Sequence, residues 1–559
     1  MSPPNPSMTL ELATRRPDCD VFILGGGVNG TGLARDLALR GLRVILAERN
    51  DLAFGASGNS SGMIHGGPRY LTTHPEVTRS SCLDSGYIQR IAPHMIFRIP
   101  FFVPVYGRGA AARVRLDAYD AFFAVYDDFQ PLKRGKLHTR LTPDECERVV
   151  PGLTTRHLAG AITSDEWGIN GARLCNANAL DAREHGATVL LRTTVEKIHL
   201  EGGAVTGVRT RDRLTGVASE YTARVVVNAT GAWGPITASL AGLEGKVKLR
   251  PGKGVHLILD RPVTDVAVLV DAIDGRQIFI EPWENTSLIG TTDDDTYADL
   301  DDLPVTTDEV RYLMEGVEQV VPRVREARIV GTTVGARPTL YKYGTTEDAL
   351  SREHEVVDHA KDGARGLYSL LGGKLASYRM FAQEAADLIA PTLGVSAHCA
   401  THTSALPGGD RLLEPAGLAE RFGISRHAAT RLISRHGARA ESVLGDGGRR
   451  ATVTVCRSEP VLAGEIRYAV KVEGARTLQD VARRTNLALG PCGGVECALA
   501  AAVIAGEALG WSPSEVRAQA ADLLRARRKS RLPAIGAAQA RAEGTIDAAL
   551  RSLGRGAMP

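Results

Sequence analysis

The feature that most constrains this chain is a glycine-rich turn between two apolar strands near its N-terminus. Residues 20–48 are DVFILGGGVNGTGLARDLALRGLRVILAE. The apolar run at 21–24 predicts a buried parallel strand, and the leucine and alanine spacing after the glycines predicts a helix. Val44, Ile45 and Leu46 predict a second strand. The order of strand, glycine turn, helix and strand is that of a βαβ unit.

The glycines of this unit have the spacing of a dinucleotide-binding fingerprint. Gly25 permits the tight turn, Gly27 lets the backbone approach a pyrophosphate, and Gly30 lets the helix pack closely on the strand. The helix N-terminus then presents unpaired N–H groups to phosphate. Glu48, at the end of the second strand, is placed to accept hydrogen bonds from a ribose. We therefore expect a dinucleotide site, although this motif alone does not choose FAD over NAD.

Composition excludes several classes of protein. With 559 residues the chain is long enough for two to four domains, and a net charge of +3 argues against a dedicated nucleic-acid binder. Eight cysteines are too few for a disulfide scaffold and indicate a reducing compartment. The N-terminus lacks the apolar core of a secretory signal, and no apolar run of about 18 residues predicts a membrane-spanning helix. We expect a cytoplasmic protein.

The segment that follows the βαβ unit favours a flavin. Residues 51–71 are dense in glycine and small hydroxyl residues, which suit a loop that wraps phosphates and a flat ring. A second small-residue turn follows the apolar strand at 225–228. From these two segments the predicted cofactor contacts are Ser57, Ser60, Ser61, His65, Gly66, Gly67 and Gly231.

The chain resembles the FAD-dependent glycerol-3-phosphate dehydrogenase family. The resemblance rests on motifs in the family's order and spacing, from about residue 20 to about residue 500. They are DVFILGGGVNGTG, GASGNSSGMIHGGPRYL, IAPHMIFRIPFFVPVYG, VVNATGAWG, GKGVHLIL, DGRQIFIEPWENTSLIGTTDDD, VGARPTL, SREHEV and GLYSLLGGKLASYR. It implies oxidation of sn-glycerol 3-phosphate to glycerone phosphate, with hydride transfer to flavin N5 and electrons passed to a quinone or a protein acceptor.

The resemblance also implies the fold, an α/β protein with a Rossmann-like FAD-binding domain of the amino-acid-oxidase type. An antiparallel-sheet substrate domain and a C-terminal helical domain complete it. The predicted boundaries are an N-terminal tail at 1–19, the FAD domain at 20–395 with substrate segments at about 85–165 and 245–345, a helical domain with a cysteine cluster at 406–525, and a basic, alanine-rich tail at 526–559.

The substrate site must hold a phosphate dianion and remove a proton from a secondary alcohol. Arginine forks and a lysine charge suit the first task, and a histidine of near-neutral pKa suits the second. The family motifs imply that Arg69, Tyr70, His256, Arg337, Arg352 and Lys374 bind substrate, that His256, Arg337 and Lys374 are catalytic, and that Gly372, Gly373, Lys374 and Leu375 contact FAD. His65 and His354 stay open as alternative bases.

Three cysteines gather late in the chain, where the family's subfamilies divide. EIRY at 465–468, ART at 475–477 and RRT at 483–485 match the aerobic, quinone-linked branch. The anaerobic catalytic subunit instead carries four cysteines for an iron–sulfur cluster. Here Cys456, Cys492 and Cys497 are present, and Ser458 takes the place of the second of the four cysteines. A [2Fe–2S] cluster with a non-cysteine ligand, a cluster-free relic, and a zinc or redox pair all stay open.

The partners of the chain follow from the same features. Five cations between Arg525 and Arg531 form either a solvated face or a contact with anionic lipid at the inner face of the cell membrane. The apolar run at 91–106 is either a buried segment or an interfacial membrane contact. A homodimer and electron-transfer subunits stay open as protein partners. The alternatives in function are a glycerol-3-phosphate oxidase that uses O2, and a flavin or iron–sulfur electron-transfer subunit without its own substrate.

Overall fold

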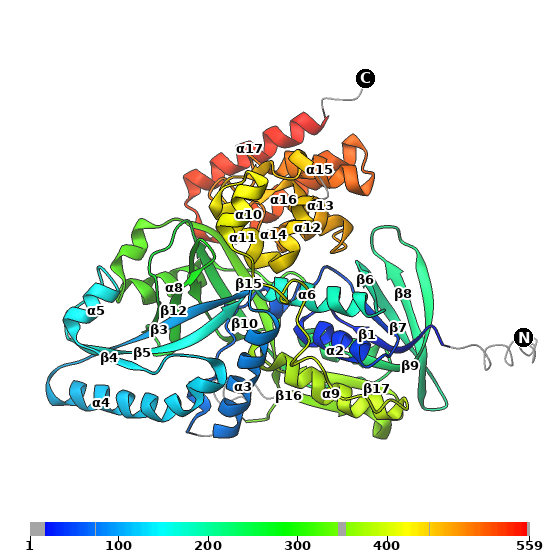
Figure 1. The fold of residues 1–559 in the computed structure, drawn as a ribbon, viewed down its shortest axis with the longest axis horizontal. Helices are drawn as coiled ribbons and strands as arrows, with labels where there is room; N and C mark the ends of the chain where they lie inside the picture. Colours follow the sequence, from blue (N-terminus) through cyan, green and yellow to red (C-terminus); the bar gives the residue numbers. More distant parts are fainter. Residues whose placement is uncertain (1–16, 73, 345–353, 446–447, 556–559) are drawn as a thin grey trace, which may run out of the picture.

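Two sheets and a helical domain build the protein, as the computed structural model in Figure 1 shows. The structure describes residues 17–72, 74–344, 354–445 and 448–555. The predicted α/β fold class is confirmed, with the predicted FAD-type domain, substrate sheet and C-terminal helical domain all present.

The first sheet contains the predicted βαβ unit. Strand β1 pairs in parallel with β2 on one side and with β9 on the other, and the paired residues Val21–Leu24, Val44–Ala47 and Val225–Asn228 are all buried. The strand order is β16 (His354–Asp358), β17 (Leu367–Gly372), β9 (Ala218–Asn228), β1 (Cys19–Leu24), β2 (Val44–Glu48) and β6 (Thr188–Leu191), and β7 (Thr193–Glu201) with β8 (Ala204–Asp212) continues from β9.

Three helices lie together beside this sheet, as Figure 1 shows. They are α2 (Val28–Leu39), α6 (Gly171–Glu184) and α9 (Tyr378–Thr392), and α2 packs against both of the others. Leu33 and Leu37 of α2 are fully buried against this layer. The Asn170 side chain caps α6 by accepting the N–H of Arg173, which sets where that helix begins.

The second sheet corresponds to the predicted substrate domain, a name kept for it below, and it is mostly antiparallel. The prediction of an antiparallel sheet needs one correction, because β11 runs parallel to β3. The order is β14 (Asp294–Asp295), β10 (Leu249–Leu259), β13 (Thr286–Gly290), β12 (Gln277–Trp283), β11 (Ala267–Asp271), β3 (Ile96–Tyr106), β5 (Leu158–Ile169) and β4 (Thr139–Leu141), with β15 (Ile329–Leu340) on β10. The helices connected with these strands are α3 (Pro75–Ile91), α4 (Gly109–Tyr126), α5 (Pro143–Val149) and α8 (Thr307–Glu318), whereas α7 (Gly234–Ser239) packs on β9 and β17 of the first sheet.

Strand β3 decides the alternative raised by the apolar run at 91–106. It lies inside the second sheet, between β5 and β11. Phe102, Val103 and Val105 are buried. The strand part of the run therefore lies within the sheet, with its apolar side chains buried or half-buried and Arg98 exposed, which favours the buried segment. Among the described residues, no helix combines the length and the apolar character needed to span a bilayer.

The C-terminal domain is helical and lies on top of the two sheets in Figure 1. Ser512 begins α16 with a capping box, in which its hydroxyl accepts the N–H of Glu515 while the Glu515 carboxylate accepts the N–H of Ser512. The domain contains α10 (Pro415–Phe422), α11 (Arg426–His436), α12 (Ala440–Gly445), α13 (Ala463–Lys471), α14 (Leu478–Thr485), α15 (Ala498–Leu509), α16 (Pro513–Arg531) and α17 (Ala537–Arg555), with the short strands β18 (Thr454–Cys456) and β19 (Val461–Leu462).

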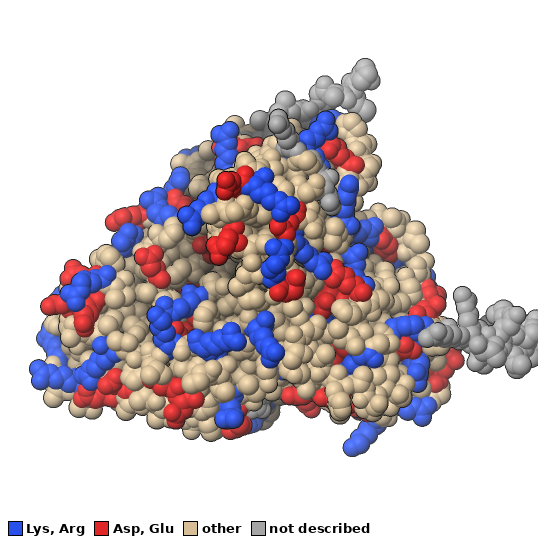
Figure 2. All heavy atoms as spheres, viewed as in Figure 1, with Lys and Arg blue, Asp and Glu red and all other residues tan. Residues whose placement is uncertain are grey.

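The predicted tail at 526–559 is wrong as a separate unit. Residues 526–531 are the last turns of α16, and α17 then packs back on that helix. The basic run at 525–531 does not form a free cationic patch either, because its side chains find partners within the protein. Arg525 pairs with Asp522, Lys529 with Asp302 and Arg531 with Glu543, while Arg527 donates to the carbonyl of Leu487. On the face shown in Figure 2, basic and acidic side chains alternate.

Candidate active site

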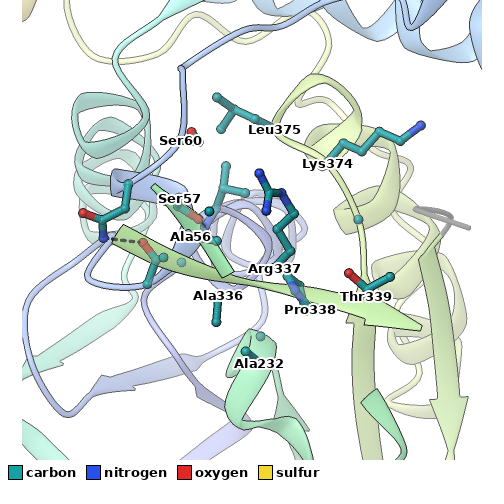
Figure 3. Close-up of a pocket in the computed structure, with 18 of the residues that line it drawn as sticks. Ala56, Ser57, Ser60, Ala232, Ala336, Arg337, Pro338, Thr339, Lys374 and Leu375 are labelled. Atoms are coloured by element: carbon teal, nitrogen blue, oxygen red, sulfur yellow. Dashed lines mark hydrogen bonds between the residues drawn. The ribbon is translucent and has the colours of Figure 1, made fainter. Parts of the chain in front are cut away.

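A cavity of about 1020 Å³ lies where the first sheet meets the second. The turn after β1, the loop at 54–70 and the turn after β17 line it from the FAD-type domain. Strands β10, β12 and β15 line it from the substrate domain. Figure 3 shows Arg337 rising from β15, with Ala56, Ser57 and Ser60 on the neighbouring loop. The two domains therefore contribute opposite walls of one site.

The βαβ end of the cavity fits a dinucleotide. Gly25 has φ +109°, and a Cβ on Gly30 would lie 2.0 Å from the carbonyl oxygen of Gly25, so the turn leaves no room for a side chain. Glu48 accepts the N–H of Gly26 at 2.8 Å and still lines the cavity. Asn29 also lines the cavity, and its buried Oδ1 has no hydrogen-bond partner within the described part of the chain. A bound dinucleotide would supply that donor.

The loop at 54–70 folds over the turn after β1. The Ser57 hydroxyl accepts the N–H of Val28, the first residue of α2, at 2.9 Å. His65 Nδ1 accepts the N–H of Gly67 at 2.9 Å, and Gly67 takes φ +69°. Ser57, Ser60, Ser61, His65 and Gly67 all line the cavity.

Gly66 does not line the cavity. A Cβ there would lie 2.2 Å from the sulfur of Cys82 and 2.3 Å from the Tyr126 hydroxyl. Gly66 therefore packs behind the loop and is not placed to make the predicted cofactor contact.

The turn after β17 closes the cavity on another side. Gly372, Gly373, Lys374 and Leu375 all line it, and both glycines have positive φ. The carbonyl of Gly372 accepts the side-chain amide of Asn29 at 3.3 Å, which joins this turn to the dinucleotide turn. A short 3-10 turn at Leu375–Ser377 precedes α9, so the glycines lie one turn before the α-helix. Gly231, with φ +59°, lines the cavity from the turn after β9.

Arg337 is held firmly in the wall of the cavity. Its Nη1 donates to Asp293 Oδ1 at 3.0 Å, and its Nη2 donates to the Thr291 hydroxyl at 3.0 Å and the Thr292 carbonyl at 3.1 Å. The side chain is one-fifth exposed. These bonds orient the guanidinium before any ligand arrives, which lowers the entropy cost of binding an anion.

His256 of β10 also lines the cavity, and it is 97% buried. Burial, together with the positive charge of Arg337, lowers its pKa to about 3. Neither ring nitrogen has a hydrogen-bond partner among the described residues, and the ring packs so closely that a Cβ on Gly290 would lie 2.2 Å from it. The imidazole is therefore neutral at physiological pH, and at least one nitrogen can accept a proton.

Tyr70 and Lys374 meet across the cavity wall. The Lys374 ammonium lies 4.0 Å from the centre of the Tyr70 ring, within the range of a cation–π contact. Both residues line the cavity. The Tyr70 phenol and the Lys374 ammonium thus line the same cavity as the Arg337 and His256 side chains.

Three other predicted residues stand differently. Arg352 lies outside the described residues, and so does the side chain of Arg69. His354 is directed to Glu384, 2.7 Å away, and its ring stacks on Phe381. It is not among the lining residues, so His65 and His256 are the histidines that face the cavity.

The sequence alone did not single out a buried ion pair beneath the loop at 54–70. Glu166 lines the cavity, and its carboxylate accepts Lys133 Nζ at 2.6 Å, the Tyr126 hydroxyl at 2.6 Å and the N–H of Gly66 at 3.1 Å. Lys133 is fully buried. The signal available in the sequence was the adjacent pair Asp165 and Glu166 inside the apolar strand β5. Lys133, which pairs with Glu166, lies 33 positions earlier in the sequence.

The late cysteines do not form a ligand set for a metal. Cys456 and Cys497 are buried in the apolar cluster of the helical domain, whereas Cys492 lies on a partly exposed turn. In the part of the chain that the structure describes, no group of three His, Cys, Asp or Glu side chains could hold a metal ion. Ser458 packs against Gly490, where a Cβ would lie 2.1 Å from it. An iron–sulfur cluster is therefore not shown, and the redox pair stays a prediction, since the Cys456 and Cys497 thiols contact one another.

Known proteins match this architecture along most of the chain. A family model for FAD dependent oxidoreductases matches residues 20–387, and a model for the C-terminal domain of alpha-glycerophosphate oxidase matches residues 399–516. The glycerol-3-phosphate dehydrogenase of Bacillus halodurans, solved with FAD, has a TM-score of 0.73 at 25% identity. The match covers 94% of this chain and 97% of that one.

Two curated relatives are more similar in sequence. One subunit of the anaerobic glycerol-3-phosphate dehydrogenase of Escherichia coli K12 is 36% identical over 488 residues, which is 86% of this chain and 87% of that protein. A glycerol-3-phosphate dehydrogenase of Mycobacterium leprae is 33% identical over 517 residues, covering 89% and 86%. Together with the site geometry, these matches show that the chain belongs to the FAD-dependent glycerol-3-phosphate dehydrogenase family.

Proposed function

We propose that this protein oxidises sn-glycerol 3-phosphate to glycerone phosphate with FAD as its cofactor. The observation that carries the proposal is the juxtaposition, in one cavity, of a dinucleotide cradle, an oriented guanidinium and a neutral buried imidazole. The names of the relatives from E. coli, M. leprae and B. halodurans support the choice of substrate.

The phosphate of the substrate needs cationic donors at one end of the cavity. Arg337 offers a planar guanidinium that its neighbours already orient, and Lys374 offers an ammonium. The Tyr70 hydroxyl is a further donor on the same wall. Arg69 and Arg352 stay predictions for this role, since their side chains lie outside the described residues.

Oxidation of the alcohol needs an acceptor for the hydroxyl proton. His256 is neutral, buried and lines the cavity, so its free ring nitrogen can take that proton as C2 is oxidised. The dianionic phosphate would stabilise the resulting imidazolium, which offsets the effect of Arg337. When bound, FAD supplies the hydride acceptor at N5. Gly25, Gly27, Glu48, Ser57 and the turn at 372–375 would hold it.

The electron acceptor is the second part of the proposal. We propose a quinone or a redox protein, in keeping with the quinone-linked motifs at 465–485. The match of residues 399–516 to the C-terminal domain of alpha-glycerophosphate oxidase favours O2 as the alternative acceptor. Because the E. coli relative is named as one part of a larger enzyme, an assembly with electron-transfer subunits is also proposed.

Anaerobic titration of the purified flavoprotein with sn-glycerol 3-phosphate tests the function. We expect the flavin absorbance near 450 nm to bleach with the wild-type protein and to bleach at least ~100-fold more slowly with His256→Asn, since a positioned base contributes that much. The enantiomer, sn-glycerol 1-phosphate, is the stereochemical control. Reoxidation by a soluble quinone without peroxide supports a dehydrogenase, whereas stoichiometric peroxide in air supports an oxidase. An unbleached wild-type flavin would sink the proposal.

A further inference from the structure

Arg276 lies in the turn between β11 and β12, on the substrate-domain wall of the cavity. Three oxygen atoms fix its guanidinium. Nε donates to Asp274 Oδ2 at 2.7 Å, and Nη1 donates to the Asp293 carbonyl at 2.8 Å and to Asp294 Oδ1 at 2.9 Å. The Tyr312 ring lies 5.4 Å from its central carbon. A side chain held from so many directions keeps one orientation.

One edge of this guanidinium remains available. In the described part of the chain, no hydrogen bond engages Nη2, and the side chain is 29% exposed. Hydrogen bonds to the side chains of Asp274 and Asp294 raise the pKa of Arg276 further above its usual range, so its guanidinium is always charged. A fixed, permanently charged donor beside a cavity is suited to an anionic ligand.

Arg276 and Arg337 share a neighbour. Arg276 donates to the backbone carbonyl of Asp293, and Arg337 donates to its side-chain carboxylate. All three residues line the cavity. The two guanidiniums are thus brought to one part of the wall by a single residue, although 61 positions separate them in the sequence.

We propose that Arg276 is a second phosphate-binding arginine, whose Nη2 donates to the phosphate of the substrate while Arg337 binds from the other side of Asp293. This inference rests on the proposed function, since it assigns the phosphate of sn-glycerol 3-phosphate to a pair of arginines. Because Asp274 and Asp294 hold the guanidinium in place, little side-chain entropy is lost on binding. Lysine cannot reproduce this arrangement, as it has one ammonium and no planar fork.

Arg276→Gln and Arg276→Lys test the proposal in the flavin-loaded protein. A hydrogen bond to a charged group is worth about tenfold or more in affinity. We therefore expect KM for sn-glycerol 3-phosphate to rise about tenfold or more in Arg276→Gln, with kcat within about threefold of wild type. Arg276→Lys should lie between the two. Retained flavin absorbance and an unchanged unfolding temperature verify the fold of both variants.

Arg250→Gln is the matched control. Arg250 is an arginine of the same sheet and pairs with Asp295, next to Asp294, but it does not line the cavity. A general change of charge around residues 293–295 would affect both variants alike, whereas contact with phosphate affects only Arg276. Equal KM increases in Arg250→Gln and Arg276→Gln would overturn the proposal, as would full recovery of KM in Arg276→Lys.

Inorganic phosphate separates this inference from the proposed function. Its binding is followed by the perturbation of the flavin spectrum, which needs no turnover. We expect phosphate to bind the wild-type protein and to bind Arg276→Gln about tenfold more weakly. Equal phosphate affinity in the two proteins would refute the role of Arg276 even if sn-glycerol 3-phosphate reduces the flavin. If the wild-type protein binds phosphate but sn-glycerol 3-phosphate does not reduce its flavin, the proposed function is refuted and the anion site is retained.

Discussion

The imidazole of His256 and the guanidinium of Arg337 face one cavity, and burial of the ring together with the charge of Arg337 lowers the pKa of His256 to about 3. A base with so low a pKa is already deprotonated at neutral pH. The kcat/KM for flavin reduction, which reports the substrate-free protein, should therefore show no loss from His256 protonation between pH 8 and pH 5. The positive charge of Arg337 is one of the two causes of this low pKa, after burial of the ring.

Arg337→Gln tests this relationship directly. Loss of the positive charge favours the imidazolium, so the pKa of His256 rises and activity begins to fall at a higher pH. We expect a lower kcat/KM, together with an acid limb that moves toward neutral pH in the pH profile of flavin reduction. A pH profile of unchanged shape, at whatever reduced rate, would contradict the electrostatic link between the two residues.

A second buried histidine makes a prediction about stability. His94 lies away from the cavity, its ring nitrogens have no partner among the described residues, and burial with the nearby Arg173 and His436 lowers its pKa to about 3. The unfolded chain binds this proton at about pH 6.5 and the folded chain does not, so stability falls as pH drops below 6.5. At pH 5 this one residue costs about 2 kcal/mol.

Between pH 7 and pH 5, the His94→Asn variant should therefore lose about 2 kcal/mol less stability than the wild type. Denaturant unfolding at the two pH values measures the difference. His74→Asn is the control, because it removes an exposed imidazole and leaves the buried His94 in place. Parallel pH dependences for wild type and His94→Asn would show that the His94 ring is protonated in the folded protein.

The dinucleotide end of the site is predictable because its determinants are local. The glycines at 25, 27 and 30 and the acid at 48 belong to one βαβ unit, and three of the four line the cavity. Gly30 does not, because it faces the carbonyl of Gly25, which is the close packing expected of that glycine. Sequence spacing within one unit fixes such contacts.

The rest of the site depends on tertiary contacts that spacing does not reveal. Gly66 belongs to a convincing loop motif, yet it packs on Cys82 and Tyr126 instead of facing the cavity. The cysteines 456, 492 and 497 have suggestive spacing, but the core of the helical domain buries two of them and leaves the third on a turn. In the basic run at 525–531, Lys529 and Arg531 pair with Asp302 and Glu543, which lie on other segments of the chain.

Lys133 gives a third prediction. Lys133 and Glu166 are both buried, 2.6 Å apart, behind the loop at 54–70. In Lys133→Met the Glu166 carboxylate stays buried without its counter-charge, which typically costs 3–5 kcal/mol of stability, so we expect a loss of about that size. Chemical denaturation measures it. Lys529→Met is the control, because the Lys529–Asp302 pair is two-thirds exposed and contributes about 1 kcal/mol at most. Equal losses in the two variants would contradict this account.

The last prediction concerns how the helical domain acts on the cofactor site. Arg484 of α14 donates to Asp51 Oδ2 at 2.5 Å, and both side chains are buried. Asp51 lies three residues after Glu48, and Arg483 lies over the ring of Phe54, which lines the cavity. The helical domain therefore holds the segment at 51–54 that follows Glu48, the residue predicted to bind the ribose.

Arg484→Gln should weaken FAD binding even though Arg484 does not line the cavity. The segment at 51–54 loses its anchor, and the buried Asp51 carboxylate keeps only Arg483, whose Nε lies 3.6 Å away, as a charged partner. We expect the dissociation constant for FAD, measured by flavin fluorescence, to rise about tenfold. Asp51→Asn removes the incompletely compensated charge, so the double variant should bind FAD more tightly than Arg484→Gln alone. Additive effects of the two substitutions would mean that the helical domain stabilises the fold without positioning this segment, because only a direct pair produces coupling between them.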